Sequence, residues 1–125
     1  MLVVEDFDPF RSFVCSVLKQ NPELDVVCEL SDGLAAVQKA EGLKPDLILM
    51  DIGLPGLNGI EAGRRIRKLL PNAKIIFLTQ ESAVDVIQEA LRLGALGYVV
   101  KTRAGSDLLP AVEAVLQGKQ YVSGL

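Results

Sequence analysis

Five short apolar segments, rich in β-branched residues, alternate along the chain with segments whose apolar residues follow helical spacing. The expected strands are Leu2–Glu5, Asp25–Leu30, Leu47–Asp51, Lys74–Thr79 and Gly97–Lys101. Four of the five are almost continuously apolar, a pattern typical of a parallel sheet that is covered on both faces. The alternation therefore predicts an α/β domain built from five β-α repeats.

Turn and capping residues predict where the helices begin. Asp8 is expected as the N-cap of the first helix with Pro9 at its first position, Asn58 as the cap of the third, and Ser82 with Asp85 as the start of the fourth. The fifth helix is expected to begin at Ser106. The residues expected on buried helical faces are Phe10, Phe13, Val14, Val17, Leu18, Leu34, Val37, Ala40, Ala62, Ile66, Leu69, Leu70, Val84, Ile87, Leu91, Leu108, Leu109, Val112, Val115 and Leu116.

Right-handed crossovers limit how such strands can be arranged. A doubly wound, five-stranded parallel sheet in the order 2-1-3-4-5 fits, and this order is taken from flavodoxin-like sheets because the sequence does not specify it. Residues 1–119 are expected to form this one domain. Residues 120–125 are expected to begin a tail, or a linker to an output domain.

Composition excludes several kinds of function. The net charge is −3, so the sequence indicates no basic surface for nucleic acid, and the lack of histidine removes Ser-His and Cys-His nucleophiles and most zinc sites. No apolar run approaches the roughly 20 residues of a membrane span, and the first residues do not resemble a signal peptide. Cys15 and Cys28 are expected as buried free thiols. A cytoplasmic location is therefore the expectation.

Chemically useful side chains stand at four of the predicted strand ends: Glu5 and Asp6, Asp51, Thr79 and Lys101. Parallel strands finish at the same edge of a sheet, which is where α/β folds bind ligands, so these groups should converge. Two like charges about 4 Å apart repel by roughly 4 kcal/mol at an effective dielectric constant of 20. Three carboxylates therefore need counter-charge, which Lys101 supplies in part and a divalent cation would complete.

The donor set and the loop after Asp51 suggest the chemistry. Oxygen ligands favour a hard ion, and Mg²⁺ fits because it binds through one or two carboxylates and accepts phosphate oxygens, although calcium is left open. The backbone carbonyl of Gly53 would be a further ligand. Asp51 would attack phosphorus and become an aspartyl phosphate, while the metal, Lys101 and Thr79 would stabilise the transferred oxygens.

Together these residues resemble the receiver domain of bacterial two-component response regulators. The resemblance spans the whole chain and rests on Glu5-Asp6, Asp51 followed by Pro55 and Gly59, Thr79, and Lys101 preceded by Gly97-Tyr98. The segments Gly97-Tyr98-Val99-Val100-Lys101 and Gly118-Lys119-Gln120-Tyr121-Val122-Ser123 are most similar to the NarL/FixJ branch, which carries a LuxR-type helix-turn-helix output domain.

The resemblance implies that Asp51 is phosphorylated by a sensor histidine kinase, and that Glu5, Asp6, Asp51 and the Gly53 carbonyl surround Mg²⁺. It also implies that Thr79 and Tyr98 form a switch pair, in which the hydroxyl moves to the phosphate and the ring follows inward. The domain would catalyse only its own phosphorylation and dephosphorylation, and would contact DNA only through an output domain. The wide apolar arc of the fourth helix suggests a homodimer formed on phosphorylation.

Three other interpretations of the sequence differ from this one in function. A receiver-like module that signals by binding alone is the main alternative, although the acceptor, the acids, Thr79 and Lys101 are all present. A flavodoxin-like redox domain is disfavoured because the loop Asp6-Phe7-Asp8-Pro9 would repel a phosphate. An aspartyl phosphatase is disfavoured because Gly53 stands where a second acid is expected.

The sequence departs from the receiver pattern at Glu5, since the family commonly has aspartate there.

Overall fold

The computed structural model describes residues 1–80 and 84–123. In chain order the elements are β1 (Leu2–Val4), α1 (Asp8–Leu18), β2 (Cys28–Leu30), α2 (Gly33–Leu43), β3 (Leu47–Asp51), α3 (Gly59–Leu69), β4 (Lys74–Thr79), α4 (Val84–Arg92), β5 (Gly97–Val100), the 3₁₀ turn η1 (Lys101–Arg103), α5 (Ala104–Leu116) and β6 (Tyr121–Val122). Within the described residues, no helix is both long and apolar enough to span a bilayer.

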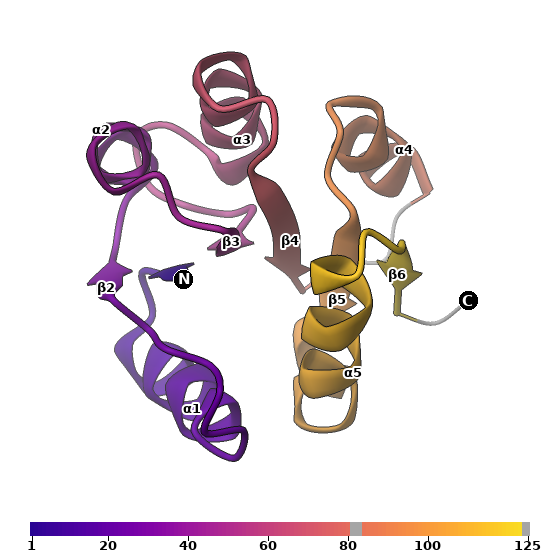
Figure 1. Ribbon diagram of the computed structural model, residues 1–125. Helices are drawn as coiled ribbons and strands as arrows, with labels where there is room; N and C mark the ends of the chain where they lie inside the picture. The colour runs from indigo at the N-terminus through magenta and orange to yellow at the C-terminus, as the bar shows by residue number, and fades with distance from the viewer. Residues whose placement is uncertain (81–83, 124–125) are drawn as a thin grey trace.

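All strand pairs are parallel, and the sheet order is β2-β1-β3-β4-β5-β6 (Figure 1). The predicted α/β architecture and the order of the first five strands are confirmed. The predicted strand count was wrong, because a short sixth strand pairs with the outer edge of β5. Helices α1 and α5 cover one face of the sheet, and α2, α3 and α4 cover the other (Figure 1).

Each face of the sheet buries its own hydrophobic cluster. Residues of β1, β3, β4 and β5 contribute alternately to the two sides, so Ile48 packs under α2 and α3 whereas Leu49 packs under α1 and α5. Both side chains are wholly buried, and this explains why the strands are apolar throughout. Cys15 is buried as predicted, whereas Cys28 is only half-buried; both are free thiols.

The segment after α5 folds back onto the sheet. The Tyr121 amide donates to the Leu96 carbonyl at 2.9 Å, and the Ser123 amide donates to the Tyr98 carbonyl at 2.8 Å. The Ser123 hydroxyl also donates to Asp107 Oδ2 in α5 at 2.8 Å, in a buried contact. Residues predicted to begin a tail therefore extend the sheet, because main-chain hydrogen bonds and one buried carboxylate hold them there.

Several predicted helix details were wrong. Asp8 lies inside α1, and Phe7 takes the N-cap position without a side-chain cap, whereas Asn58 does cap α3 by accepting from the Glu61 amide. The predicted start at Ser82 lies outside the described residues. Five side chains expected in the core are instead substantially exposed, because each lies at a helix end or beside the apolar stripe: Phe13, Leu34, Leu69, Val84 and Leu116.

The contact between Ser123 and Asp107 should stabilise the folded state in a pH-dependent way. The hydroxyl of Ser123, followed by the Arg103 guanidinium, lowers the pKa of Asp107 below its ordinary value of 3.8. A carboxyl with a lowered pKa stabilises the fold above its ordinary pKa, and that stabilisation is lost as the pH falls through the folded-state value. Ser123→Ala should cost about 1 to 3 kcal/mol at pH 7, and the cost should shrink below the ordinary pKa.

Chemical denaturation of both proteins at neutral and acidic pH measures this difference. Ser12→Ala changes an exposed serine of α1 and serves as the control. A pH-independent cost for Ser123→Ala would mean that the ionised carboxylate is not the relevant partner.

Candidate active site

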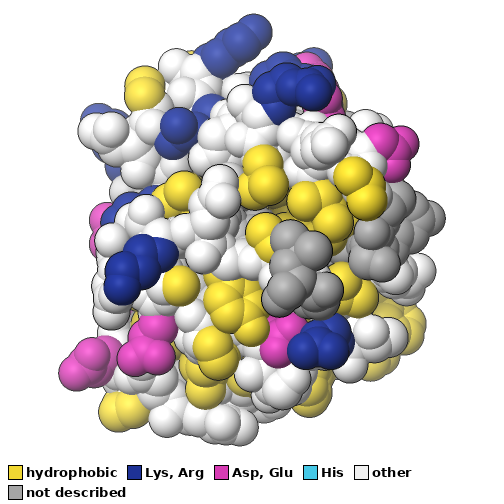
Figure 2. All heavy atoms as spheres, turned by 90° about the vertical axis from the view of Figure 1, so that its right-hand side faces the viewer, with side chains coloured by type: hydrophobic (Ala, Val, Ile, Leu, Met, Phe, Trp, Pro, Cys, Tyr) yellow, Lys and Arg dark blue, Asp and Glu magenta, His cyan; other side chains and the backbone are white. Residues whose placement is uncertain are grey.

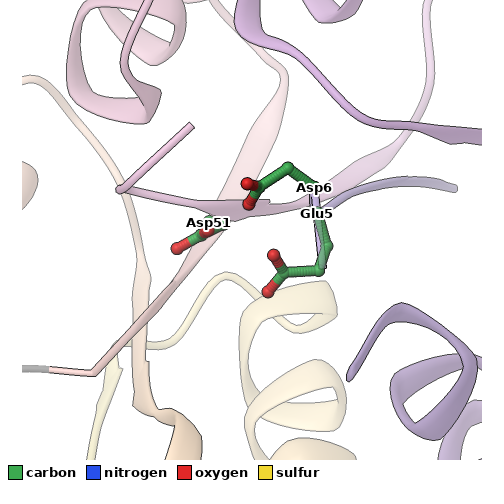
Figure 3. A group of neighbouring side chains, drawn as sticks. All are labelled: Glu5, Asp6 and Asp51. Atoms are coloured by element: carbon green, nitrogen blue, oxygen red, sulfur yellow. The ribbon is translucent and has the colours of Figure 1, made fainter. Parts of the chain in front are cut away.

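Three carboxylates meet at the carboxyl edge of the sheet. Val4 pairs with Met50, so the residues that follow β1 lie beside the last residue of β3. Carboxylate oxygens of Glu5, Asp6 and Asp51 all lie within 4.8 Å of one another. Figure 3 shows the three side chains directed toward one small space. The structure thus brings together the acids that the strand-end pattern places at this edge.

The loop after β3 holds Asp51 in place. The Gly53 amide donates to Asp51 Oδ1 at 3.1 Å, and the Gly59 amide donates to the Ile52 carbonyl at 2.9 Å. A Cβ at position 59 would lie only 2.1 Å from the Asp51 carbonyl oxygen, so only glycine lets the start of α3 approach so closely. The loop and the capped helix therefore determine the orientation of the Asp51 side chain.

Lys101 lies in η1, directly after β5, and contributes the positive charge. Its Nζ is 2.5 Å from Glu5 Oε1 and 3.3 Å from Asp51 Oδ2. The Glu5 side chain is wholly buried, and its Oε2 accepts from the Phe7 amide at 3.1 Å. Three carboxylates against one ammonium leave two negative charges if all four groups are ionised.

Burial dominates the electrostatics of Glu5. Desolvation raises the pKa of this carboxyl above its ordinary value of 4.5, and the nearby charge of Asp51 adds to the effect. The Lys101 ammonium and the Phe7 amide act in the opposite direction but do not cancel it. The ionised form of Glu5 is therefore held at a cost in stability.

The donor set fits a divalent, oxygen-preferring ion. Glu5, Asp6 and Asp51 offer three carboxylates in one cluster, and two uncompensated negative charges match the charge of such an ion. Asp6 is exposed to solvent, which leaves one side of the cluster open to water. The residues present therefore suit Mg²⁺ better than a metal that prefers nitrogen or sulfur.

Asp6 and Asp51 line a pocket of about 850 Å³, whereas Glu5 is buried beneath it. Thr79, at the end of β4, and Gly53 line this pocket together with Asp51 and Lys101. Tyr98 does not line it: the ring is fully buried in the cluster under α4, beside Phe77 of the neighbouring strand. Five of the predicted site residues thus share one cavity, Asp6 included, and Tyr98 lies behind it.

Sequence reasoning missed several groups around the pocket. Phe7, Phe10, Gln80 and Thr102 also line it, and Arg11 Nη1 donates to the Glu5 carbonyl at 2.8 Å. Phe10 was expected only as a core residue of the first helix. For Phe7, Phe10 and Arg11, the signal is the run directly after the acidic pair, because a helix that starts there places its first turn over the site. For Gln80 and Thr102, it is their position directly after Thr79 and Lys101.

An α/β sheet with this strand order belongs to the flavodoxin-like class, whose ligand sites lie at the carboxyl edge of the sheet, and the pocket with its acids and Lys101 lies there. The response regulator receiver domain family matches residues 1–113. The chain therefore belongs to the receiver domain family of two-component response regulators, whose members are signalling domains.

Relatives and solved structures agree with this assignment. The chain is 35% identical to the transcriptional regulatory protein DegU of Brevibacillus brevis, over 98% of this chain and 52% of DegU. It is 38% identical to the response regulator protein VraR of Staphylococcus saprophyticus, over 90% of this chain and 54% of VraR. A LuxR-family response regulator from Aurantimonas superposes with a TM-score of 0.94, at 32% identity and covering 98% of this chain and 88% of that one.

The chain thus spans about half the length of the curated relatives it matches. The response regulator domain of Thermotoga maritima CheB, with 33% identity and a TM-score of 0.84, confirms the receiver fold over 93% of this chain and 94% of that one. Membership of the receiver family also rules against the two alternative assignments, a flavodoxin-like redox domain and an aspartyl phosphatase.

Neutralising Glu5 should make the metal-free protein more stable. A carboxyl whose folded-state pKa is raised penalises the fold above that pKa, and the penalty vanishes below the ordinary value of 4.5. Lys101 retains Asp51 as a partner, so Glu5→Gln should raise the melting temperature by a few degrees at pH 7 in a chelator. The gain should shrink as the pH falls below the ordinary carboxyl pKa.

Thermal unfolding monitored by circular dichroism measures the effect. Glu113→Gln, an exposed glutamate of α5, is the matched control and should change little. A lower melting temperature for Glu5→Gln at neutral pH would show that the ion pair with Lys101 outweighs the desolvation of Glu5.

Proposed function

We propose that this domain is a switch controlled by phosphorylation of Asp51, with a sensor histidine kinase as phosphoryl donor and Mg²⁺ as cofactor. The observation that carries the proposal is the placement of the Asp51 carboxylate. It lies at the floor of an open pocket, 3.3 Å from the Lys101 ammonium and clustered with Glu5 and Asp6. Family membership supports the same chemistry.

The proposed step is a phosphoryl transfer between two side chains. An Asp51 carboxylate oxygen forms a bond to phosphorus while the bond from phosphorus to the donor's imidazole nitrogen breaks, and the electron pair stays on that nitrogen. The product is an acyl phosphate on Asp51. Lys101 is close enough to pair with an oxygen of the new phosphoryl group, and Thr79 lines the same pocket with a hydroxyl that can donate to it.

Glu5, Asp6, Asp51 and the Gly53 carbonyl would hold the Mg²⁺ ion. When bound, the ion supplies positive charge to the phosphoryl oxygens. The protein's contribution is the cluster itself: Glu5 is fixed by burial and by the Phe7 amide, and Asp51 by the Gly53 amide. The residual double negative charge of the cluster favours a divalent over a monovalent ion.

The response to phosphorylation would involve Thr79, Tyr98 and the surface of α4 and β5. Thr79 ends β4 and Tyr98 lies on β5, so a hydrogen bond between Thr79 and the phosphoryl group would act on both strands. Val84 of α4 is 67% exposed, and hydrophobic side chains gather on the side of the molecule where α4 and β6 lie (Figure 2). We infer that this apolar surface forms a homodimer when Asp51 is phosphorylated.

Control of transcription is part of the proposal, as is a cytoplasmic site of action. Several relatives, DegU among them, are named as transcriptional regulatory proteins and are about twice as long as this chain. Contact with DNA would be made by an output domain and not by the receiver itself.

Replacing the acceptor should abolish phosphorylation. Incubation of the wild type with acetyl phosphate and Mg²⁺ should add one phosphoryl group, and Asp51→Asn should add none, because an amide oxygen is too weak a nucleophile. Intact-mass spectrometry gives the result directly. Asp46→Asn, the same change at the opposite end of β3, is the control and should be labelled normally.

Labelling of Asp51→Asn would place the acceptor elsewhere. Binding of Mg²⁺ by the wild type without any phosphate uptake would favour the alternative of a receiver-like module that signals by binding alone.

Removing the ammonium should slow the reaction and weaken the response. Lys101→Ala should be labelled about ten- to a hundredfold more slowly, since it removes charge stabilisation of the transferred oxygens. Light scattering should show that phosphorylation increases the molar mass of the wild type in solution, through dimerisation, but not that of the variant. Lys119→Ala, an exposed lysine after α5, is the control.

Normal labelling together with normal association of Lys101→Ala would remove the role proposed for this lysine. An unchanged mass of the phosphorylated wild type would count against dimerisation.

A further inference from the structure

Lys101 has a third neighbour besides the two acids. Its Nζ lies 4.9 Å from the centroid of the Phe10 ring, over the face of that ring. The Lys101 side chain is only 12% exposed, so the ring and the two carboxylates surround much of the ammonium. Phe10 also lines the pocket into which Asp51 opens.

We propose that Phe10 is a positioning residue, which holds the Lys101 ammonium where it can meet the phosphoryl group on Asp51. A lysine has a flexible four-carbon stem, and attraction to Glu5 alone would draw it to the buried side of the site. The face of an aromatic ring attracts a cation and also excludes water from one side of it. The inference rests on the proposed phosphorylation of Asp51 and names how Lys101 is held for that reaction.

The first turn of α1 fixes the ring in advance. Phe10 packs against the hydrophobic cluster between α1, α5 and the sheet, and its ring contacts that of Phe13 at a centroid distance of 5.9 Å. Arg11 ties the same turn to the end of β1, donating to the Glu5 carbonyl at 2.8 Å and pairing with Asp8 at 2.6 Å. These contacts anchor the ring through packing with Phe13 and through the backbone of Glu5, separately from the two oxygens that Lys101 contacts, Glu5 Oε1 and Asp51 Oδ2.

This independence matters because Glu5 and Asp51 both change partners in the proposed cycle. Glu5 is a candidate metal ligand, and Asp51 loses its negative oxygen when it becomes an acyl phosphate. The Phe10 ring is the neighbour of Lys101 that neither step alters. It would keep the ammonium at the mouth of the acid cluster in both states of the domain.

A set of three variants tests the ring. Phe10→Leu removes the aromatic face and should slow labelling of Asp51 by acetyl phosphate about three- to tenfold. Phe10→Tyr keeps the face and should restore the rate. Phe13→Leu removes a ring that packs beside Phe10 but does not cover Lys101, so it should slow labelling less than Phe10→Leu does.

A double-mutant cycle separates positioning of Lys101 from a general structural effect. In a Lys101→Ala background, Phe10→Leu should have no further effect on the labelling rate. An equal slowing with and without Lys101, an unchanged rate for Phe10→Leu, or a failure of Phe10→Tyr to restore the rate would overturn the proposal.

A spectroscopic measurement decides the point without any phosphodonor. A lysine NH₃⁺ signal is seen in ¹H–¹⁵N spectra when the ammonium is held and exchanges its protons slowly with water, and Lys101→Arg identifies it by its absence. The Lys101 signal should be present in the wild type and Phe10→Tyr and lost in Phe10→Leu. If the wild type takes up no phosphate, the proposed function fails, and this signal still tells whether Phe10 holds Lys101.

Discussion

The charge of the site is set by one constraint: the parallel sheet places three carboxylates, which repel one another, at the same edge. Because β1 and β3 are neighbours, the backbones of Glu5, Asp6 and Asp51 are held side by side at the edge of the sheet. Lys101, delivered by the end of β5, offsets part of this charge from the far side of β4. The remaining negative charge is what suits this cluster to the divalent cation proposed for it.

The rest of the molecule holds the strands and the loop that carry these carboxylates in fixed positions. Two hydrophobic layers hold the strands, and Gly59 lets α3 begin directly against the backbone of Asp51. Glu5 is wholly buried with a raised pKa, so the fold gives up stability to keep a carboxylate there. Such a trade is expected where function requires charge in a place that folding alone would leave apolar.

Sequence reasoning was most successful where one local pattern had one structural meaning. Continuous apolar strands separated by amphipathic helices predicted the α/β class, and the polar residues at strand ends predicted which side chains would meet. It was least successful at helix faces. Leu34 and Val84 fit helical periodicity but lie outside the core, because the part of a helix surface that is covered depends on how the helix sits on the sheet. The predicted N-cap of α1 was also off by one residue. Phe7 takes the N-cap position instead of Asp8, because the Phe7 amide donates to the buried Glu5 carboxylate, a contact outside the helix itself.

The sequence by itself determined the order of elements, the polarity of the sheet and the set of groups at its carboxyl edge, since these follow from local hydrophobic pattern and from parallel connectivity. Only the tertiary structure decided the sixth strand, the burial of Tyr98 and the place of the Phe10 ring over Lys101. Each of these depends on contacts between segments far apart in the chain. Residue spacing along one segment carries no information about such a contact, because its partner belongs to a different segment.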